Sequence, residues 1–258
     1  MINIESSVIT YIGLVRESNE DNYFLNGKFK SDSSIEIEGY TDKQQRDSYL
    51  YAVCDGMGGE RHGEVASLIA VETLEEYQMT NIRKTVMEYI QRANRLICDE
   101  IDKNGGSRIG TTLALLYIRN NKAIAYNIGD SRVYFLRDGD LYLLSEDHTE
   151  AQRLVKTGQL TEDEAVNHVT KNKLTQHLGL FPDEMFVLPY VSVEIDLMKD
   201  DIFMICSDGL TDMVSDDEIA EILSTEGKDS TDLVKIMATT VQASGGRDNA
   251  TFIVIKAS

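Results

Sequence analysis

Hydrophobic residues gather in short β-branched runs along most of the chain, with polar or glycine-containing turns between them. Such runs predict about nine strands, at residues 8–15, 48–54, 111–118, 122–129, 131–138, 140–145, 187–196, 201–207 and 250–256. Helical spacing predicts amphipathic helices at residues 63–79, 81–102, 150–158, 161–168, 216–224 and 229–245. The long helices come in pairs rather than alternating with strands. This order favours an α+β fold, with a mostly antiparallel core and helices outside, over a doubly wound parallel sheet.

Short connections and polar stretches indicate how these elements are joined. Asp138-Gly139 lies between two predicted strands and is a hairpin signal, and residues 119–123 are a second candidate. Residues 26–47 are polar, contain a weak strand pattern, and are interpreted as a surface excursion. Residues 150–183 are charged and helical. We interpret them as a flap on a single domain spanning residues 1–258 rather than as a second domain.

Composition narrows the functional classes. The net charge is −19, from 25 basic and 44 acidic residues, and a surface this acidic repels phosphate backbones and anionic lipids. We therefore expect neither nucleic acid nor a membrane as partner. The amino terminus has no basic region before an apolar stretch, and no apolar run reaches the ~18 residues that span a bilayer. Cys54, Cys98 and Cys206 have no CxxC spacing, so we expect reduced, buried thiols in a cytoplasmic monomer.

Acidic residues stand at the ends of several predicted strands. Asp55-Gly56 and Asp208-Gly209 each end an apolar run and are followed by a predicted helix, so neither is a hairpin turn. Three more strand ends carry acids beside Gly or Asn, namely Asp130, Asp248 and the pair Glu20-Asp21. These acids are either independent turn caps or side chains that converge on one site.

Convergence would require protons or cations, because carboxylates held together at a partly buried site raise one another's pKa. Carboxylate and carbonyl oxygens suit Mg²⁺ or Mn²⁺, and the sequence has no His/Cys cluster with zinc spacing. Gly56 has no Cβ, so its main-chain carbonyl can approach such an ion closely. Arg16 could bind a phosphoryl group bidentately through two of its guanidinium nitrogens, or it could pair with Glu17 or Glu20.

The glycine-rich loop that follows Asp55 does not fit a nucleotide. Residues 58–65 have the glycine spacing of a phosphate-binding loop, but Glu64 and Val65 stand where Lys and Ser or Thr are needed. The dinucleotide pattern also fails, because Arg61 takes the place of its third glycine. We therefore expect the loop to be built around metal.

Seven segments, in this order, resemble the metal-dependent serine/threonine protein phosphatases (PPM, protein phosphatase type 2C), bacterial branch, over residues 9–255. They read GLVRESNEDNYF, YAVCDGMGG with GEVAS, GTTLALLYI, NIGDSRVYFLRDG, LSEDHT, CSDGLTDMV and GGRDNATFIVI. The resemblance implies a four-layer α-β-β-α sandwich of two stacked antiparallel sheets flanked by helix pairs, with a two-metal centre at one end.

The resemblance also implies roles for individual residues. Asp55 is similar to the carboxylate that bridges both ions, the Gly56 carbonyl to a ligand of the first, and Asp208 and Asp248 to ligands of the second. Glu20 and Asp21 resemble acids that orient metal-bound waters, and Arg16 resembles the phosphate-binding arginine. Asp130, with Asp208, resembles the pair that holds a third and weaker ion in bacterial members.

The activity implied is hydrolysis of phosphoserine and phosphothreonine in proteins, the substrates of Ser/Thr kinases, by direct attack of a water or hydroxide bridging two Mn²⁺ or Mg²⁺ ions. The sequence departs from the eukaryotic pattern at Met57, where those members carry a histidine proposed as general acid. His62 is a candidate for a catalytic part, with a surface histidine as the alternative, and His148 is interpreted as a packing residue.

Two alternatives to a general protein phosphatase stay open. One is a phosphatase-like module that binds phosphoproteins with weak or no turnover, which the loss of Asp55, Asp208 or Asp248 would have favoured. The other is a phosphatase restricted to one phosphorylated regulator.

Overall fold

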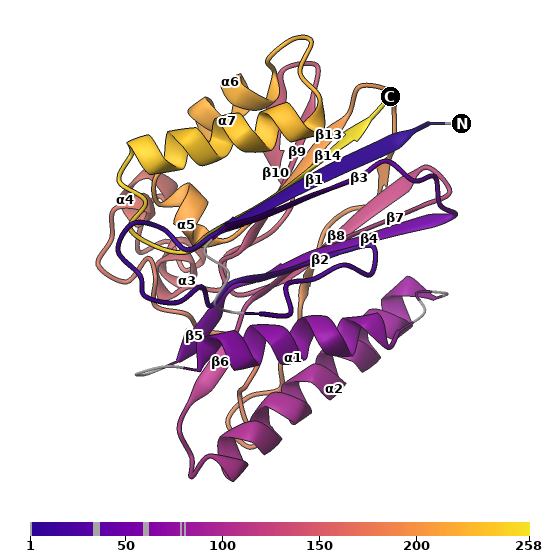
Figure 1. Cartoon of the computed structure of the whole chain (residues 1–258). Helices are drawn as coiled ribbons and strands as arrows, with labels where there is room; N and C mark the ends of the chain where they lie inside the picture. The colour runs from indigo at the N-terminus through magenta and orange to yellow at the C-terminus, as the bar shows by residue number, and fades with distance from the viewer. Residues whose placement is uncertain (1, 33–36, 59–61, 78, 80) are drawn as a thin grey trace.

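Two antiparallel sheets packed face to face form the centre of the molecule, with helices on both outer sides (Figure 1). The structure is a computed structural model that describes residues 2–32, 37–58, 62–77, 79 and 81–258. This arrangement is the α-β-β-α sandwich that the sequence predicts. All strand pairs between the described strands are antiparallel.

The first sheet has six strands in the order β10-β9-β13-β14-β1-β3. Their bounds are Asp140–Leu143 (β10), Arg132–Arg137 (β9), Ile202–Cys206 (β13), Ala250–Ala257 (β14), Ile4–Tyr11 (β1) and Ile37–Asp42 (β3). Strands from the two ends of the chain pair along their whole length, with Ile4 opposite Ala257 and Tyr11 opposite Ala250.

The second sheet runs β11-β8-β7-β4-β2, with β12 also paired to β8. Its strands are Tyr190–Val191 (β11), Lys122–Ile128 (β8), Leu113–Arg119 (β7), Ser48–Cys54 (β4), Asn22–Leu25 (β2) and Ile195–Asp196 (β12). A separate two-stranded antiparallel sheet consists of β5 (Gly56–Gly58) and β6 (Ile109–Thr111), which lie on either side of α1 and α2 in the chain.

Two pairs of long helices cover the sheets. The second sheet carries α1 (Gly63–Glu75) and α2 (Ile82–Lys103), and the first carries α6 (Asp216–Leu223) and α7 (Ser230–Ala243). Three short helices lie near one end of the sandwich, namely α3 (Glu150–Lys156), α4 (Glu162–Val166) and α5 (Asp208–Thr211). Among the described residues, no helix is both long and apolar enough to cross a membrane.

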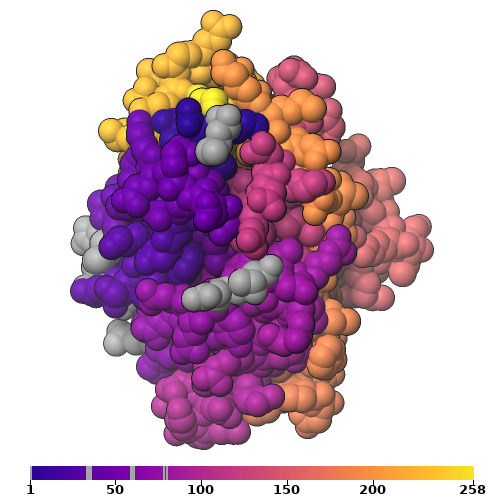
Figure 2. Space-filling view, turned by 90° about the vertical axis from the view of Figure 1, so that its right-hand side faces the viewer, coloured from indigo at the N-terminus to yellow at the C-terminus, as the bar shows by residue number. Residues whose placement is uncertain are grey.

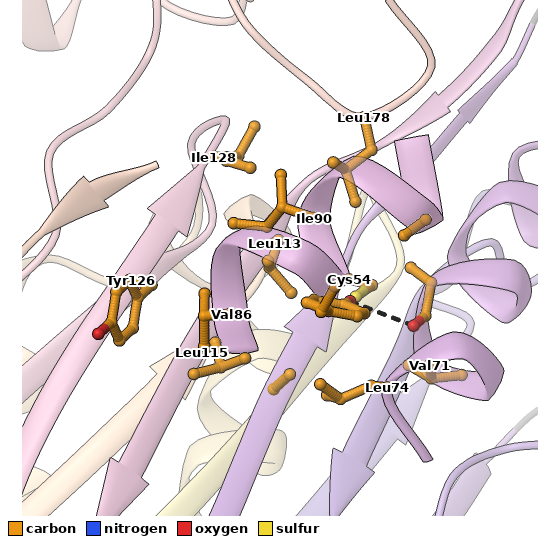
Figure 3. Packing of buried hydrophobic residues seen from close by; sticks show 14 of the residues in the cluster. Cys54, Val71, Leu74, Val86, Ile90, Leu113, Leu115, Tyr126, Ile128 and Leu178 are labelled. Carbon is orange, nitrogen blue, oxygen red and sulfur yellow. Dashed lines mark hydrogen bonds between the residues drawn. The ribbon is translucent and has the colours of Figure 1, made fainter. Parts of the chain in front are cut away.

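Both faces of strand β4 are buried, and each face packs into a different hydrophobic cluster. Tyr51 and Val53 pack into the cluster between the two sheets, whereas Ala52 and Cys54 pack into the cluster under α1 and α2. The alternation follows from the two-residue period of a strand. Figure 3 shows Cys54 among residues of the helix-covered cluster. A third cluster lies between the first sheet and α6–α7, so three apolar layers join the four structural layers.

Both predicted hairpins are confirmed. Asp138 and Gly139 have φ of 54° and 89° between β9 and β10, and Asn120 and Asn121 have φ of 53° and 56° between β7 and β8. Positive φ at both central residues is the geometry of a type I′ turn, which matches the twist of the joined strands.

Three predictions about the elements need correction. The predicted strand 187–196 contains only two-residue strands, β11 and β12, because it follows the edge of the sheet and pairs only with β8. The first strand ends at Tyr11 rather than continuing to residue 15. The sequence also missed β2, β5 and α5, which are four residues long or shorter.

Candidate metal centre

The acids that the sequence singled out come from the loops at one end of the two sheets. Asp55 follows β4, Asp130 follows β8, and Asp208 follows β13 as the first residue of α5. Asp248 precedes β14, and Glu20-Asp21 precedes β2. The structure brings these groups together, because the charges of Asp21, Asp208 and Asp130 all act on Asp55. They are therefore not independent turn caps.

Burial and mutual repulsion raise the pKa values of these carboxyl groups. Burial is the main cause at Asp55 and at Asp208, and the charge of Asp130 adds to it at both. Burial raises the pKa of Asp130 to about 7 and that of Asp21 to about 6. The side chains of Asp55 and Asp208 also interact with each other, which raises the pKa of Asp55 further.

Three features of the structure fit a hard divalent cation. Oxygen is the donor atom throughout the acidic set. One buried oxygen of Asp21 and one of Glu64 have no hydrogen-bond partner. A Cβ at Gly56 would lie 2.3 Å from the Gly63 oxygen and 2.5 Å from the Glu20 oxygen, so only glycine lets these backbones meet.

The acidic side chains lie near one another but do not form a complete coordination shell. Among the residues that the structure describes, no group of three His, Cys, Asp or Glu side chains is arranged as a complete set of ligands. The acidic set nevertheless fits a divalent metal in the chemistry of its donor atoms, all of which are oxygens.

Arg16 approaches the acidic set from the solvent side. Its Nη2 lies 2.5 Å from Asp248 Oδ2, and half of its side chain is exposed. The sequence offered Glu17 and Glu20 as ion-pair partners of Arg16, whereas this ion pair is formed with Asp248. The arginine is therefore next to a proposed ligand, at the rim where a phosphoryl group would arrive.

Glu20 is held at the amino terminus of α1. Its carboxylate accepts hydrogen bonds from the backbone N–H groups of Gly63 and His62, where the partial positive charge of a helix lies. His62 itself is exposed, with a φ of 141°, and caps the helix without a side-chain bond. Residues 59–61 of the glycine-rich loop lie outside the described part of the chain.

Thr111 and Thr112 hold the backbone of Asp55 in place. The Asp55 N–H donates to Thr112 Oγ1 and the Thr111 hydroxyl donates to the Asp55 carbonyl, each at 2.9 Å. His148 accepts a hydrogen bond from the Gly129 N–H through Nδ1, beside Asp130. Burial lowers its pKa, which fits a hydrogen-bonding rather than an acid role.

Sequence reasoning missed several residues that shape the centre. Asn249 accepts from the Glu20 N–H at 2.8 Å and donates to the Ile12 and Ser18 carbonyls, so it fixes the loop of Arg16. Ser207 donates to Asp21 Oδ2 at 2.7 Å. Their positions in the sequence could have pointed to them, since Asn249 follows Asp248 and Ser207 precedes Asp208.

Sequence reasoning also missed Lys30, a buried cation whose pKa is affected by the charge of Asp21. Its Nζ donates to the Asn19 carbonyl at 2.7 Å, and only 2% of the residue is exposed. Burial lowers its pKa to about 8. Its place in the polar stretch 26–47 gave no sign of this contact.

A buried cluster of carboxylates at one end of an α-β-β-α sandwich defines the class of metal-dependent phosphatases that the sequence resembles. The model of the family described as protein phosphatase 2C matches residues 8–250. The chain belongs to this family.

Individual relatives match over nearly the full length. The serine/threonine phosphatase stp of Listeria monocytogenes is 32% identical over 260 residues, which cover 95% of this chain and 92% of the relative. The serine/threonine phosphatase of S. agalactiae has a TM-score of 0.83 and 30% identity, covering 98% of this chain and 99% of its own.

A third relative bears on the metal. The catalytic domain of the serine/threonine protein phosphatase PstP, solved in complex with two manganese ions, has a TM-score of 0.79 and 27% identity. It covers 100% of this chain and 99% of its own. The chain is thus a metal-dependent protein phosphatase by family.

Proposed function

We propose that this protein hydrolyses phosphoserine and phosphothreonine in proteins that Ser/Thr kinases have phosphorylated. The observation that supports this most directly is the buried set of Asp55, Asp208, Asp130 and Asp21, with Arg16 at its rim. We propose that the chain acts as a cytoplasmic monomer, in a single domain of residues 1–258 with a flap at residues 150–183. In that setting its role is dephosphorylation in signal transduction.

The proposed ligands are Asp55, the Gly56 carbonyl, Asp208 and Asp248 for two Mn²⁺ or Mg²⁺ ions, with Glu20 and Asp21 as partners of their waters. Asp130 with Asp208 is the proposed site of a third ion. Such ions, when bound, lower the pKa of water to near neutrality and withdraw negative charge from phosphoryl oxygens.

The side chains of this protein have distinct parts in that chemistry. Arg16 binds and orients the phosphoryl group, since its planar guanidinium can donate two parallel hydrogen bonds. Glu20 and Asp21 accept hydrogen bonds from the attacking water and set its direction. Asn249 and Thr112 hold the backbone of this constellation in place.

A cysteine nucleophile is not needed and does not fit. Cys54, Cys98 and Cys206 are free and buried, and burial raises the pKa of each thiol. A thiol is a nucleophile only as the thiolate, which these environments disfavour. Met57 has no proton to give, so the leaving alkoxide takes its proton from water or from another side chain.

The test is hydrolysis of p-nitrophenyl phosphate and of a phosphothreonine peptide with Mn²⁺, Mg²⁺ or EDTA. We expect activity only with metal, and a loss of at least about 100-fold in Asp208→Ala, because a ligand to the attacking centre is gone. Circular dichroism of the variant checks that it folds. Binding of the phosphopeptide without turnover in any metal would instead identify a phosphoprotein-binding module.

A further inference from the structure

Lys30 is a buried cation in a stretch that the sequence predicts to be a surface excursion. β2 is an edge strand of the second sheet and β3 an edge strand of the first, so the chain between them passes from one sheet to the other. In Figure 2 the early part of the chain, in indigo and violet, lies along the left-hand side of the molecule. Among the residues that the structure describes, Lys30 is the only buried lysine or arginine. Burying a charge is costly unless opposite charges and hydrogen bonds compensate for it.

Hydrogen bonds hold the backbone of Lys30 beside the acidic set. Its N–H donates to Asn22 Oδ1 at 3.0 Å, and Asn22 Nδ2 donates to its carbonyl at 2.9 Å. Asn22 directly follows Asp21, and it is buried like the lysine. From this position the lysine Nζ donates to the Asn19 carbonyl, two residues before Asp21. The ammonium group is therefore fixed next to the loop that carries Glu20 and Asp21.

Several carboxylates act on this ammonium group, and the strongest of these effects is that of Asp21. Only 1% of Asp21 is exposed, one of its oxygens accepts from the Ser207 hydroxyl, and the other has no hydrogen-bond partner. A buried oxygen of Glu64, whose charge also acts on Lys30, has none either. Hydrogen bonds thus leave part of this buried negative charge without compensation, and the positive charge of Lys30 offsets some of it.

The two cations next to the acidic set differ in their access to solvent. Half of the Arg16 side chain is exposed, whereas Lys30 is 2% exposed. A phosphoryl group that arrives from the solvent can meet Arg16 but not Lys30. The contacts of Lys30 therefore fit a part in the charge balance of the centre rather than in binding substrate.

A fixed, buried positive charge beside a metal centre has opposite effects on its two states. Without metal, it offsets the repulsion among the carboxylates and so stabilises the folded chain. With metal, it repels the divalent ions that the same carboxylates attract. Salt screens this repulsion only weakly, because the lysine is buried.

Building on the proposed metal centre, we propose that Lys30 is its built-in counter-ion. It stabilises the folded chain before metal binds, and it weakens the binding of the ions that follow. It acts through its charge on Asp21 and through its bond to the Asn19 carbonyl, and it is too buried to touch the substrate. Lys30 therefore sets how much Mn²⁺ or Mg²⁺ the protein needs.

The experiment compares Lys30→Met with the unaltered chain at about pH 7, where an amine with a pKa of about 8 is mainly charged. Methionine keeps an apolar stem and removes the charge. In urea unfolding with EDTA the midpoint should fall, and with saturating Mn²⁺ it should fall less, because bound ions then balance the carboxylates. Calorimetric titration of the folded proteins should give a Kd for Mn²⁺ roughly 3–10-fold lower in Lys30→Met.

Lys28→Met is the matched control. Lys28 is exposed on the same segment, so the same change of charge there is screened by water and salt. It should leave both urea midpoints unchanged and the Kd for Mn²⁺ within about twofold.

A double-mutant cycle in EDTA tests the contact with Asp21 without metal. Lys30→Met should lower the midpoint less in an Asp21→Asn background than in the unaltered chain, because no unpaired buried carboxylate is left behind. The cycle stays informative if Lys30→Met alone does not fold in EDTA, since Lys30→Met/Asp21→Asn should then recover a folded chain.

Equal losses of stability in EDTA and in Mn²⁺, or an unchanged or higher Kd for Mn²⁺, would overturn the inference, because a merely structural lysine has these properties. Additive effects of Lys30→Met and Asp21→Asn in EDTA, or a double variant that is as unfolded as Lys30→Met, would overturn it as well. An unaltered chain that binds no Mn²⁺ and hydrolyses no phosphate ester would instead contradict the proposed function, whereas the cycle in EDTA would still test the counter-ion.

Discussion

Single residues at the centre depend on how closely backbones approach. The Asp-Gly pairs at residues 55–56 and 208–209 each have a glycine where a side chain cannot fit. A Cβ at Gly209 would lie 1.8 Å from the Asn249 oxygen, and one at Gly56 would lie 2.3 Å from the Gly63 oxygen. The glycines therefore bring the loops of the proposed ligands into contact, and the aspartates beside them lie where those loops meet.

Gly56→Ala should lower the free energy of unfolding by about 1–3 kcal/mol, because the added methyl group forces two backbones apart. It should also abolish metal-dependent hydrolysis, since the 56 carbonyl and Glu20 are displaced together. Urea unfolding and p-nitrophenyl phosphate turnover measure the two effects. Gly39→Ala is the control, since its Cβ would have only ordinary contacts at 3.6 Å or more. A Gly56→Ala enzyme as stable and as active as its parent would refute this account of the glycine.

A pH effect on stability is expected from His177, whose pKa is lowered by burial. Above the ordinary histidine pKa of about 6.5 the ring is neutral in both states. Below it the unfolded chain takes up a proton before the folded protein does, so stability is lost as pH falls through this window to the lower, folded-state pKa. Between pH 7.5 and 5.5, in EDTA, His177→Gln should lose less stability than its parent. Parallel losses in urea unfolding would show that His177 does not titrate in this way.

The acids at the strand ends could be singled out because their signal is local, since each lies in a segment with Gly or Asn beside it at the end of an apolar run. Their roles as ligands stay predictions. Their partners could not be singled out in this way. Ser207, Asn249 and Asp212 are ordinary polar residues, and only tertiary contacts place them against Asp21, the Arg16 loop and the flap. The pairing of Arg16 with Asp248 could not be predicted for the same reason, since the two residues are 232 positions apart in the chain.

At the scale of elements, α2 fixes the segment that returns from the flap. Asn94 is only 5% exposed, and its side chain accepts from the Gly179 N–H at 2.7 Å and donates to the Leu180 carbonyl at 2.9 Å. One side chain thus satisfies two backbone groups next to the isolated bridge that Leu178 forms with Thr111. The amphipathic pattern of α2 predicted the helix but not this bond.

Asn94→Ala should lower the free energy of unfolding by about 2–4 kcal/mol, because two backbone groups are left without partners in a buried place. Asn104→Ala, at the exposed end of the same helix, removes a bond to Glu100 only and should cost less than about 0.5 kcal/mol. Urea unfolding of both variants tests the difference. Similar costs for the two would mean that water replaces the Asn94 bonds.

The predicted bounds of a strand match the observed ones where the hydrophobic run also finds neighbouring strands to pair with. The central strand β4 has β7 on one side and β2 on the other, and the run at residues 48–54 matches it residue for residue. The run 187–196 is also rich in β-branched residues, but it lies along an edge and exposes Leu188, Tyr190 and Val193. Hydrophobicity alone does not show how many neighbours a segment will find.

Over the whole molecule, the charge of −19 surrounds a site whose substrates are themselves anionic. The cavity beside the acidic set adds Glu162, Asp163 and Asp217 to this field, and its two cations are already paired, Arg132 with Asp147 and Lys171 with Asp212. Acidic residues next to a phosphorylated side chain should therefore be repelled, and basic ones attracted.

We expect a phosphothreonine peptide flanked by lysines to have a kcat/KM roughly 3–10-fold higher than an otherwise identical peptide flanked by glutamates, at low salt. Because the screening length falls from about 10 Å at 0.1 M salt to about 3 Å at 1 M, the ratio should shrink steadily as NaCl is added. Steady-state rates at four salt concentrations, with Mn²⁺ held constant, measure it. A preference that survives high salt would come from direct contacts in the cavity, and a preference for glutamates would show that the acidic field does not select substrates.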